Sequence, residues 1–589
     1  MKKFLALLMT LLMAFSTLGG MACRGAGGSD SPEDLEIYVY TQGFGATWLE
    51  GVIEEFKKQD WVKEKYPKLT VDLEADSQGS KPLDKLANQK TNNTDLMFGQ
   101  YGIDKVDRAY LTNLTEKVYL TEIPGQPGTL IMDRLPDQVK NVLTRPGYGT
   151  TTLEGVEYGN YYAGKHLYMI YNWMYNKTLF DQLAPQFGWE LPVTTEEWHH
   201  ICDDVQQTGY TYEFKGQNVL CKDPILTTAV DGGYTESQLE MWWTQYEGFE
   251  EYENFFNGIY EGRQTSEVLQ QVGRYRALQQ CEEMHQKYGY SNALATDAKT
   301  GQGLFLSGHS LFHYNGDYFT TEMQLTRDGL RAQGINYEIA SFACPITSTL
   351  VERLSFYADA EGYPAKPEFD YAPFAGQTVP FSTLSQEKQD KYDKVLSTLI
   401  REIDAGKTWD NCSKEINGFA ITEEDFNIVY GARTIKGRAY LGNEAFVVPS
   451  QTPAKELACD FIRFMYTDIA IEKFSVASKG LAMPTTYFED IGDADYERVT
   501  SQFESEAINK FDMLFNRHAD YATGWQILPQ NENYDFGKAG LKTLDSYNGN
   551  MNQDFLSTET DRNTAKSIFV ADCEWWQGDK WNILVNSVG

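Results

Sequence analysis

The pattern of apolar and polar residues predicts a parallel α/β unit at the start of the folded chain. Residues 35–40 and 69–73 alternate with the period of two that strands require, and residues 48–58 between them repeat apolar side chains at helical spacing. A third apolar run covers residues 95–98. Strands that alternate with helices in this way form parallel sheets, whose ligands bind beyond the carboxyl ends of the strands.

The loops that follow these strands therefore hold the first candidate ligand contacts. Gln42 and Phe44 follow the first strand, and Gln100 and Tyr101 follow the third. Asp95 stands at the start of its strand, where a structural role is the better interpretation.

A second stretch, residues 302–323, predicts a short helix ending at Gly308, an apolar strand, a turn and a new helix. The turn contains Asn315 and Asp317, and Tyr318 opens the second helix. Free backbone N–H groups at a helix start, beside a flat ring, suit the wall of a pocket. A β-to-α connection inside a core accounts for the same residues, so both interpretations stay open here.

The first residues indicate an exported protein. Residues 1–3 are basic and residues 4–18 are apolar, a run shorter than the roughly 20 residues that a transmembrane helix needs. Small residues then lead to Cys23, which resembles the acylated cysteine of bacterial lipoproteins. Bacterial lipoproteins usually carry Leu three residues before that cysteine, where this chain has Gly20. An ordinary cleaved signal with an incidental cysteine is the alternative.

On the lipoprotein interpretation, residues 1–22 form a signal peptide and the mature chain starts at a lipidated Cys23, with palmitate among the expected acyl groups. Residues 23–32 are rich in Gly and Ser and lack apolar periodicity, so they read as a flexible tether. A folded domain held at a membrane by acyl chains needs such a tether.

Composition narrows the function classes. The 589 residues carry a formal net charge of −33, which argues against nucleic-acid and anionic-lipid partners. The seven cysteines after Cys23 are widely spaced and form no C-x-x-C pair, so no zinc site or dense disulfide framework is indicated, although one long-range disulfide remains possible. We predict no metal and no cofactor.

No catalytic motif stands out. The chain has no G-x-S-x-G elbow, no phosphate-binding G-x-x-x-x-G-K-[ST] loop and no H-E-x-x-H pair. The adjacent His199 and His200 point apart on a helix and make a poor metal pair. With 84 acidic residues, a pair of carboxylates for glycoside hydrolysis cannot be dismissed by counting. We predict no catalytic residues and no enzymatic activity.

Five stretches, in order along the chain, resemble the extracellular solute-binding proteins of bacterial ABC importers, in the family 1 sugar-binding group that includes maltose-binding protein. They are T-D-L-M-F (94–98), L-Y-M-I-Y-N-W-M-Y-N-K (167–177), L-P-V-T-T-E-E-W (191–198), residues 302–319, and residues 446–468. Tyr318 stands where many members of that family have a tryptophan.

The resemblance implies an α/β, two-lobed, periplasmic-binding-protein-like (type II) Venus-flytrap fold with three hinge crossings. We expect the crossings near residues 165–170, 337–345 and 480–484. Lobe one would then hold residues 33–165 and 345–480, and lobe two residues 166–340 and 485–589. Relative to shorter members, residues 350–440 form an insertion.

The family position also adds ligand contacts. Trp242 and Trp243 are adjacent, so on a helix they point about 100° apart, and one can face a ligand while the other is core. Sugars stack their C–H faces on such rings, and their hydroxyl groups need hydrogen-bonding partners. The further candidates are Asp231, Arg438, Trp525 and Trp575.

The resemblance implies the substrate-binding component of an ABC transporter. It would capture a carbohydrate, most simply an oligosaccharide, between its lobes and deliver it to permease subunits in the membrane. We expect a monomer facing outside the cell, in contact with the membrane only through its lipid. A receptor for a cation, polyamine, peptide or other small solute is the alternative, followed by a secreted glycoside hydrolase.

Overall fold

The computed structural model describes most of the chain after residue 30. The described residues are 31–41, 43, 45–76, 94–100, 108–135, 139–140, 143–144, 148–214, 216–230, 235–316, 318–362, 381–435, 437–440, 444–477, 483–484, 555–556 and 564–588. The predicted signal peptide and Cys23 lie outside them.

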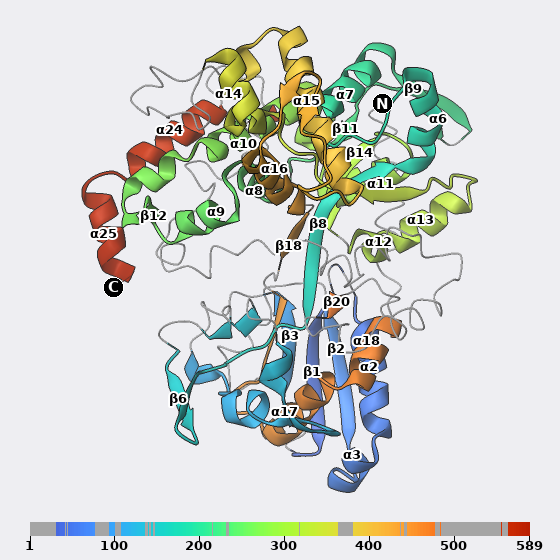
Figure 1. The fold of residues 1–589 in the computed structure, drawn as a ribbon. Helices are drawn as coiled ribbons and strands as arrows, with labels where there is room; N and C mark the ends of the chain where they lie inside the picture. The colour runs from blue at the N-terminus through green and yellow to red at the C-terminus, as the bar shows by residue number, and fades with distance from the viewer. Residues whose placement is uncertain are drawn as a thin grey trace.

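The chain forms two lobes joined by a long strand, β8 (Leu167–Asn176), which runs from one to the other (Figure 1). Lobe one contains a four-stranded sheet in the order β19-β3-β1-β2. Its strands are β1 (Asp34–Tyr40), β2 (Thr70–Asp76), β3 (Leu96–Gln100) and β19 (Glu444–Val447). β1 pairs in parallel with β2 and β3, and β19 is antiparallel to β3.

Helices cover the lobe-one sheet because their apolar residues fall on one face. In α2 (Thr47–Lys58), Trp48, Val52 and Phe56 are buried at helical spacing. The other α-helices among the described residues of this lobe are α3 (Asp60–Lys65), α17 (Lys455–Met465) and α18 (Asp468–Ala477). Two hairpins complete it, β4–β5 (Glu122–Ile123, Gln126–Leu130) and β6–β7 (Thr150–Leu153, Val156–Gly159).

Lobe two is built on β8. Its sheet runs β11-β14-β8-β15, with β11 (Ile225–Leu226) parallel to β14 (Phe312–Gly316). β14 and β15 (Ile339–Phe342) both run antiparallel to β8. Two hairpins belong to this lobe, β9–β10 (Tyr210–Phe214, Gln217–Cys221) and β12–β13 (Ile259–Tyr260, Arg263–Gln264).

Many helices surround this sheet (Figure 1). They are α6 (Lys177–Phe187), α7 (Thr195–Thr208), α8 (Thr235–Glu247), α9 (Phe249–Phe256), α10 (Val272–Glu283), α11 (Ala298–Leu306), α12 (Phe319–Glu322), α13 (Gln324–Arg331), α24 (Ala565–Trp575) and α25 (Asp579–Val588).

Two short strands pair with the first half of β8 and mark the other crossings between the lobes. In β18 (Arg438–Tyr440), Arg438 lies opposite Tyr171, and in β20 (Met483–Pro484), Pro484 lies opposite Leu167. The chain thus passes to lobe two along β8, returns along β18, and leaves lobe one again at β20.

This route differs from the sequence prediction of a crossing near residues 337–345 and of residues 345–480 in lobe one. β15 pairs with the second half of β8, inside lobe two, and the described residues that follow, up to residue 435, belong to that lobe. The reason is that the predicted insertion, residues 350–440, packs on lobe two where it is described, so the return to lobe one comes later.

The insertion has its own core. Leu350, Leu396 and Val429 belong to a buried cluster that is separate from the main core of the molecule and includes Val193 of lobe two. Its elements are α14 (Ser355–Glu361), α15 (Gln386–Asp404), β16 (Glu415–Ile416), β17 (Phe419–Ala420) and α16 (Glu423–Thr434).

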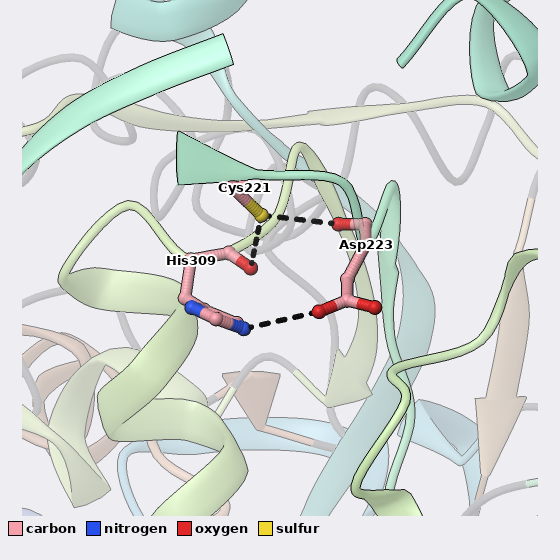
Figure 2. A group of neighbouring side chains, drawn as sticks. All are labelled: Cys221, Asp223 and His309. Atoms are coloured by element: carbon pink, nitrogen blue, oxygen red, sulfur yellow. Dashed lines mark hydrogen bonds and ion pairs between the residues drawn. The ribbon is translucent and has the colours of Figure 1, made fainter. Parts of the chain in front are cut away.

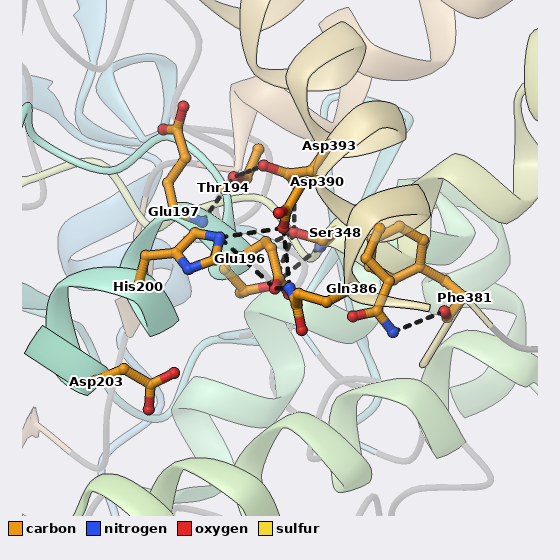
Figure 3. Close-up of polar contacts among 12 residues, drawn as sticks. Thr194, Glu196, Glu197, His200, Asp203, Ser348, Phe381, Gln386, Asp390 and Asp393 are labelled. Atoms are coloured by element: carbon orange, nitrogen blue, oxygen red, sulfur yellow. Dashed lines mark hydrogen bonds and ion pairs between the residues drawn. The ribbon is translucent and has the colours of Figure 1, made fainter. Parts of the chain in front are cut away.

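Polar contacts attach this insertion to the start of α7 (Figure 3). Asp393 of α15 is buried and accepts hydrogen bonds from Thr194 Oγ1 (2.8 Å) and Ser348 Oγ (2.7 Å). Burial raises the pKa of Asp393 to about 8, against the opposing effect of these two hydroxyl donors. Closer to the surface, Gln386 donates to Glu196 and Asp390.

Asp393→Asn tests this attachment. Because the pKa of Asp393 is higher in the folded protein than in the unfolded chain, the carboxyl group lowers stability as pH rises from about 4 to 8. The Asn variant lacks that penalty, so it should gain about 1.4 kcal/mol per pH unit relative to the original protein between pH 5 and 7. Urea unfolding at several pH values measures the gain. A difference independent of pH contradicts the prediction.

The seven cysteines among the described residues are all buried, and none forms a disulfide. Among the described residues, no helix is both long and apolar enough to cross a membrane.

Candidate ligand-binding site at the lobe junction

Tyr318 lies where the two lobes meet. It precedes α12, just after β14, and its ring folds over Gly316, where any Cβ atom would overlap it. From lobe one, Gly43 approaches the same side chain, so that a Cβ atom on Gly43 would lie 3.4 Å from Tyr318 Cβ and Cγ. Gly43 also has φ of +88°, a conformation that favours glycine. The loop after β1 therefore reaches Tyr318 across the junction.

Two more tyrosines of the lobe-two sheet surround this ring. Tyr171 of β8 meets Tyr318 edge-on, with centroids 6.0 Å apart, and is stacked with Tyr314 of β14 at 6.4 Å. Tyr171, Tyr314 and Tyr318 are 8%, 3% and 8% exposed. Together these three residues form an aromatic cluster beside the crossing strands, which we call the junction cluster.

A chain of hydrogen bonds fixes the turn that carries Tyr318. His313 Nδ1–H donates to Leu226 O (3.0 Å), and His313 Nε2 accepts from Asn315 Nδ2 (3.0 Å). Asn315 Oδ1 then accepts from Gly316 N (2.7 Å). Burial lowers the pKa of His313 to about 4, so the imidazole is neutral at physiological pH and keeps Nε2 as an acceptor.

This chain corrects one prediction. Asn315 is 0% exposed and both ends of its amide are engaged with neighbouring residues. It shapes the turn and has no surface open to a ligand. The sequence pattern predicted the turn correctly. The Asn315 amide, however, is buried and hydrogen-bonds to the backbone of the turn.

The pairing of the strands shows where the backbone of two further predicted ligand contacts lies. Arg438 lies opposite Tyr171, which also pairs with Gly316, so Arg438 stands in the row of the junction cluster. Gln100 ends β3 of lobe one, next to β1, whose following loop contains Gly43. Both belong to segments that meet at the junction.

The paired indoles of α8 are core residues. Trp242 and Trp243 are both 0% exposed, and their Nε1–H groups donate to Pro345 O (3.1 Å) and Gln271 Oε1 (2.7 Å). The prediction that one of them faces a ligand is wrong in this structure. Helical spacing did separate the two rings, but α8 is covered on both sides, by α10 and by the insertion.

Trp575 also lies away from the junction. It ends α24, which packs on α10 at the far side of lobe two from β18 (Figure 1), and Lys580 Nζ lies 3.0 Å from its ring centroid. Its 46% exposure faces solvent there. The remaining candidates lie outside the described residues: Gln42, Phe44, Tyr101, Asp231, Asp317 and Trp525.

The sequence prediction missed Tyr171 and Tyr314. A signal existed, because Tyr171, Trp173 and Tyr175 alternate along β8 and so place their rings on one face of the strand. What the sequence lacked was the pairing of β14 with β8, which brings Tyr314 to that face.

Comparison with proteins of known structure identifies the fold class. No family model and no curated protein sequence matches the chain. A structure reported in work on xylan utilisation by the thermophilic bacterium Caldanaerobius polysaccharolyticus has a TM-score of 0.50 at 12% identity, over 92% of this chain and 100% of that one. The bacterial solute receptor AcbH, reported to prefer β-D-galactopyranose exclusively, has a TM-score of 0.50 at 9% identity, over 92% and 98%. At these identities the similarity establishes the fold alone. The chain has the two-lobed α/β fold of periplasmic-binding proteins, which confirms the predicted fold class.

Proposed function

We propose that this protein captures a carbohydrate between its two lobes and delivers it to the permease subunits of an ABC importer. The observation that carries the proposal is Tyr318, a ring that one lobe holds in place and the other covers. Sugars bind aromatic rings through their C–H faces, and such a contact contributes about 0.5–1.5 kcal/mol beyond area burial. Separation of the lobes would uncover the ring, and closure over a ligand would exclude water.

The comparisons support a carbohydrate as the ligand. The two solved structures described above are connected with sugars, one through xylan utilisation and one through β-D-galactopyranose. An oligosaccharide suits the aromatic content of the chain. A receptor for a peptide, polyamine or other small solute is the second candidate, and a secreted glycoside hydrolase is the third.

The remaining parts of the proposal concern location. Cys23 would carry the lipid that holds the protein on the outer face of the cell membrane, with residues 23–32 as the tether. The protein would act as a monomer, without enzymatic activity, and would meet the permease subunits with a closed ligand-bound form.

A ligand panel tests this function. Protein lacking residues 1–22 is mixed with di- to pentasaccharides, polyamines, peptides and simple cations, and its thermal unfolding is followed. A ligand at 100 times its dissociation constant should stabilise the protein by about 2.7 kcal/mol. Stabilisation by peptides or polyamines alone would replace the carbohydrate, and release of cleaved sugar would assign an enzyme.

Tyr318→Ala should weaken binding of that ligand about tenfold, because a lost stacking contact of about 1.4 kcal/mol corresponds to one power of ten. Tyr318→Phe keeps the ring and should retain most of the affinity. Tyr430→Ala, at an exposed tyrosine of the insertion, is the matched control and should bind normally. Isothermal titration calorimetry gives all three constants. Equal affinity in Tyr318→Ala would remove Tyr318 from the site.

A further inference from the structure

Three side chains of different donor types converge in lobe two (Figure 2). Cys221 ends β10, Asp223 lies in the connection to β11, and His309 lies in the turn between α11 and β14. One ligand atom from each, a sulfur, a carboxylate oxygen and a ring nitrogen, all lie within 4.8 Å of one another.

The closest pair of these atoms has the spacing of two ligands on one ion. His309 Nε2 lies 3.3 Å from Asp223 Oδ2. Nitrogen and oxygen ligands about 2.0–2.2 Å from a tetrahedral zinc ion lie about 3.3–3.5 Å apart. Apart from this close approach to Asp223, His309 Nε2 makes no hydrogen bond with any described residue, and it is shielded from solvent. A ring nitrogen in that position is available to a cation.

The sulfur is held beside the other two ligands. Cys221 is 1% exposed, and its Sγ–H donates to the main-chain oxygens of His309 (3.3 Å) and Asp223 (3.7 Å). Burial raises the pKa of this thiol to about 11, so without a cation it is protonated. A zinc ion would bind the sulfur as thiolate, and the thiol proton would leave to solvent.

Neighbouring groups orient the nitrogen and the carboxylate. Tyr212 Oη lies 2.9 Å from His309 Nδ1, and Ser291 donates to Asp223 from N (3.2 Å) and Oγ (3.4 Å). Histidines that bind metals usually donate their other ring N–H to a fixed acceptor, which sets the tautomer. With Tyr212 Oη as that acceptor, His309 presents the Nε2 lone pair toward Asp223.

We propose that Cys221, Asp223 and His309 bind one zinc ion. Sulfur and imidazole ligands together favour zinc over magnesium or calcium, which prefer oxygen alone. Three protein ligands leave one tetrahedral position for water or another donor. The ion would join the end of β10, the connection to β11 and the turn before β14. Cys221 and Asp223 are two residues apart, but His309 lies 86 residues further along the chain, so no local motif marks this group in the sequence.

Cobalt(II) gives the decisive test, because a thiolate bound to cobalt absorbs in the near ultraviolet while oxygen and nitrogen ligands do not. Tag-free protein lacking residues 1–22 is titrated with Co²⁺, and zinc is then added to displace it. We expect one equivalent of the charge-transfer band, lost in Cys221→Ser. His309→Gln and Asp223→Asn should bind at least 10-fold more weakly. Tyr212→Phe should weaken binding about 10- to 100-fold while keeping the band.

The matched control is a second cluster of possible ligands, Glu196, His200 and Asp390, on the surface between α7 and α15 (Figure 3). It contains no sulfur, so His200→Gln should leave the cobalt band unchanged. Absence of the band in the original protein, or its persistence in Cys221→Ser, would overturn the proposal. Binding lost only in His200→Gln would assign the metal to the surface cluster instead. Circular dichroism of each metal-free variant verifies its fold.

Discussion

Acidification from pH 7 to pH 5 is expected to destabilise this protein by several kcal/mol. Four histidines are buried, each no more than 9% exposed, and the loss of hydration lowers all four pKa values. The folded-state pKa is about 3 for His166 and His285 and about 4 for His199 and His313. In the unfolded chain, an imidazole has a pKa near 6.5.

The direction of this pH effect follows from proton uptake by the unfolded chain. Between pH 6.5 and 4 the unfolded chain binds protons on these imidazoles and the folded protein does not, so stability falls as pH falls. Each group contributes about 1.4 kcal/mol per pH unit. Asp393 opposes them, because its raised pKa makes the folded protein bind a proton over the same range. The expected net slope is about 4 kcal/mol per pH unit near pH 5.5.

Variants separate this effect from general instability. His199 Nε2 accepts a hydrogen bond from Gln280 (2.9 Å), and His199→Gln should reduce the slope by about 1.4 kcal/mol per pH unit. Leu396→Ala in the core of the insertion is the control, since it should lower stability by about 2–5 kcal/mol at every pH and leave the slope unchanged. Urea unfolding between pH 5 and 7 supplies both numbers. A flat pH profile for the original protein would refute the prediction.

Arg274→Ala is expected to cost about 3–5 kcal/mol of stability. Arg274 of α10 is 0% exposed and pairs with Asp572 of α24. It also donates to Leu269 O (3.1 Å) and lies 5.4 Å from the ring centroids of Phe255 and Phe569. Removing the guanidinium leaves a buried carboxylate without its cation, where α24 packs on lobe two.

Two further variants show whether the loss comes from the buried ion pair. The double variant Arg274→Met, Asp572→Leu replaces both charges with apolar side chains and should recover most of the loss, since a buried pair gains little over well-packed apolar residues. Lys177→Ala breaks an exposed pair with Asp181 and should cost no more than about 0.5 kcal/mol. Denaturant unfolding measures all three. A double variant as unstable as Arg274→Ala would point to packing as the source of the loss.

The sequence was sufficient for the fold class and for most of lobe one. Alternation at residues 35–40 and the helical spacing of Trp48, Val52 and Phe56 report local periodicity, and the structure has a strand and a helix there. The positions of the three crossings between the lobes were harder to predict from the sequence. Their number agrees with the pairing of β18 and β20 on β8, but the second lies about a hundred residues later than predicted. Local patterns do not reveal which lobe an insertion joins.

The candidate site shows the same limit. Tyr318 follows a turn with a strong local signal, and the structure places it at the lobe junction, where its contact with a ligand stays a prediction. Trp242, Trp243 and Asn315 have equally suggestive local patterns, yet they are buried because of segments distant in sequence. Pro345 and Gln271 accept the indole hydrogen bonds, and His313 engages the amide. Burial by such distant partners decides between a core residue and a ligand contact.

The pairing of β18 and β20 on the first half of β8 has a mechanical consequence. Strands linked by backbone hydrogen bonds resist sliding along one another and resist independent twisting, whereas a sheet bends more easily across its plane. Three separate coils would let the lobes rotate about any axis. We expect this ribbon to favour opening and closing of the lobes about one axis, and such a motion would bring Gly43 back to the same face of Tyr318 at each closure.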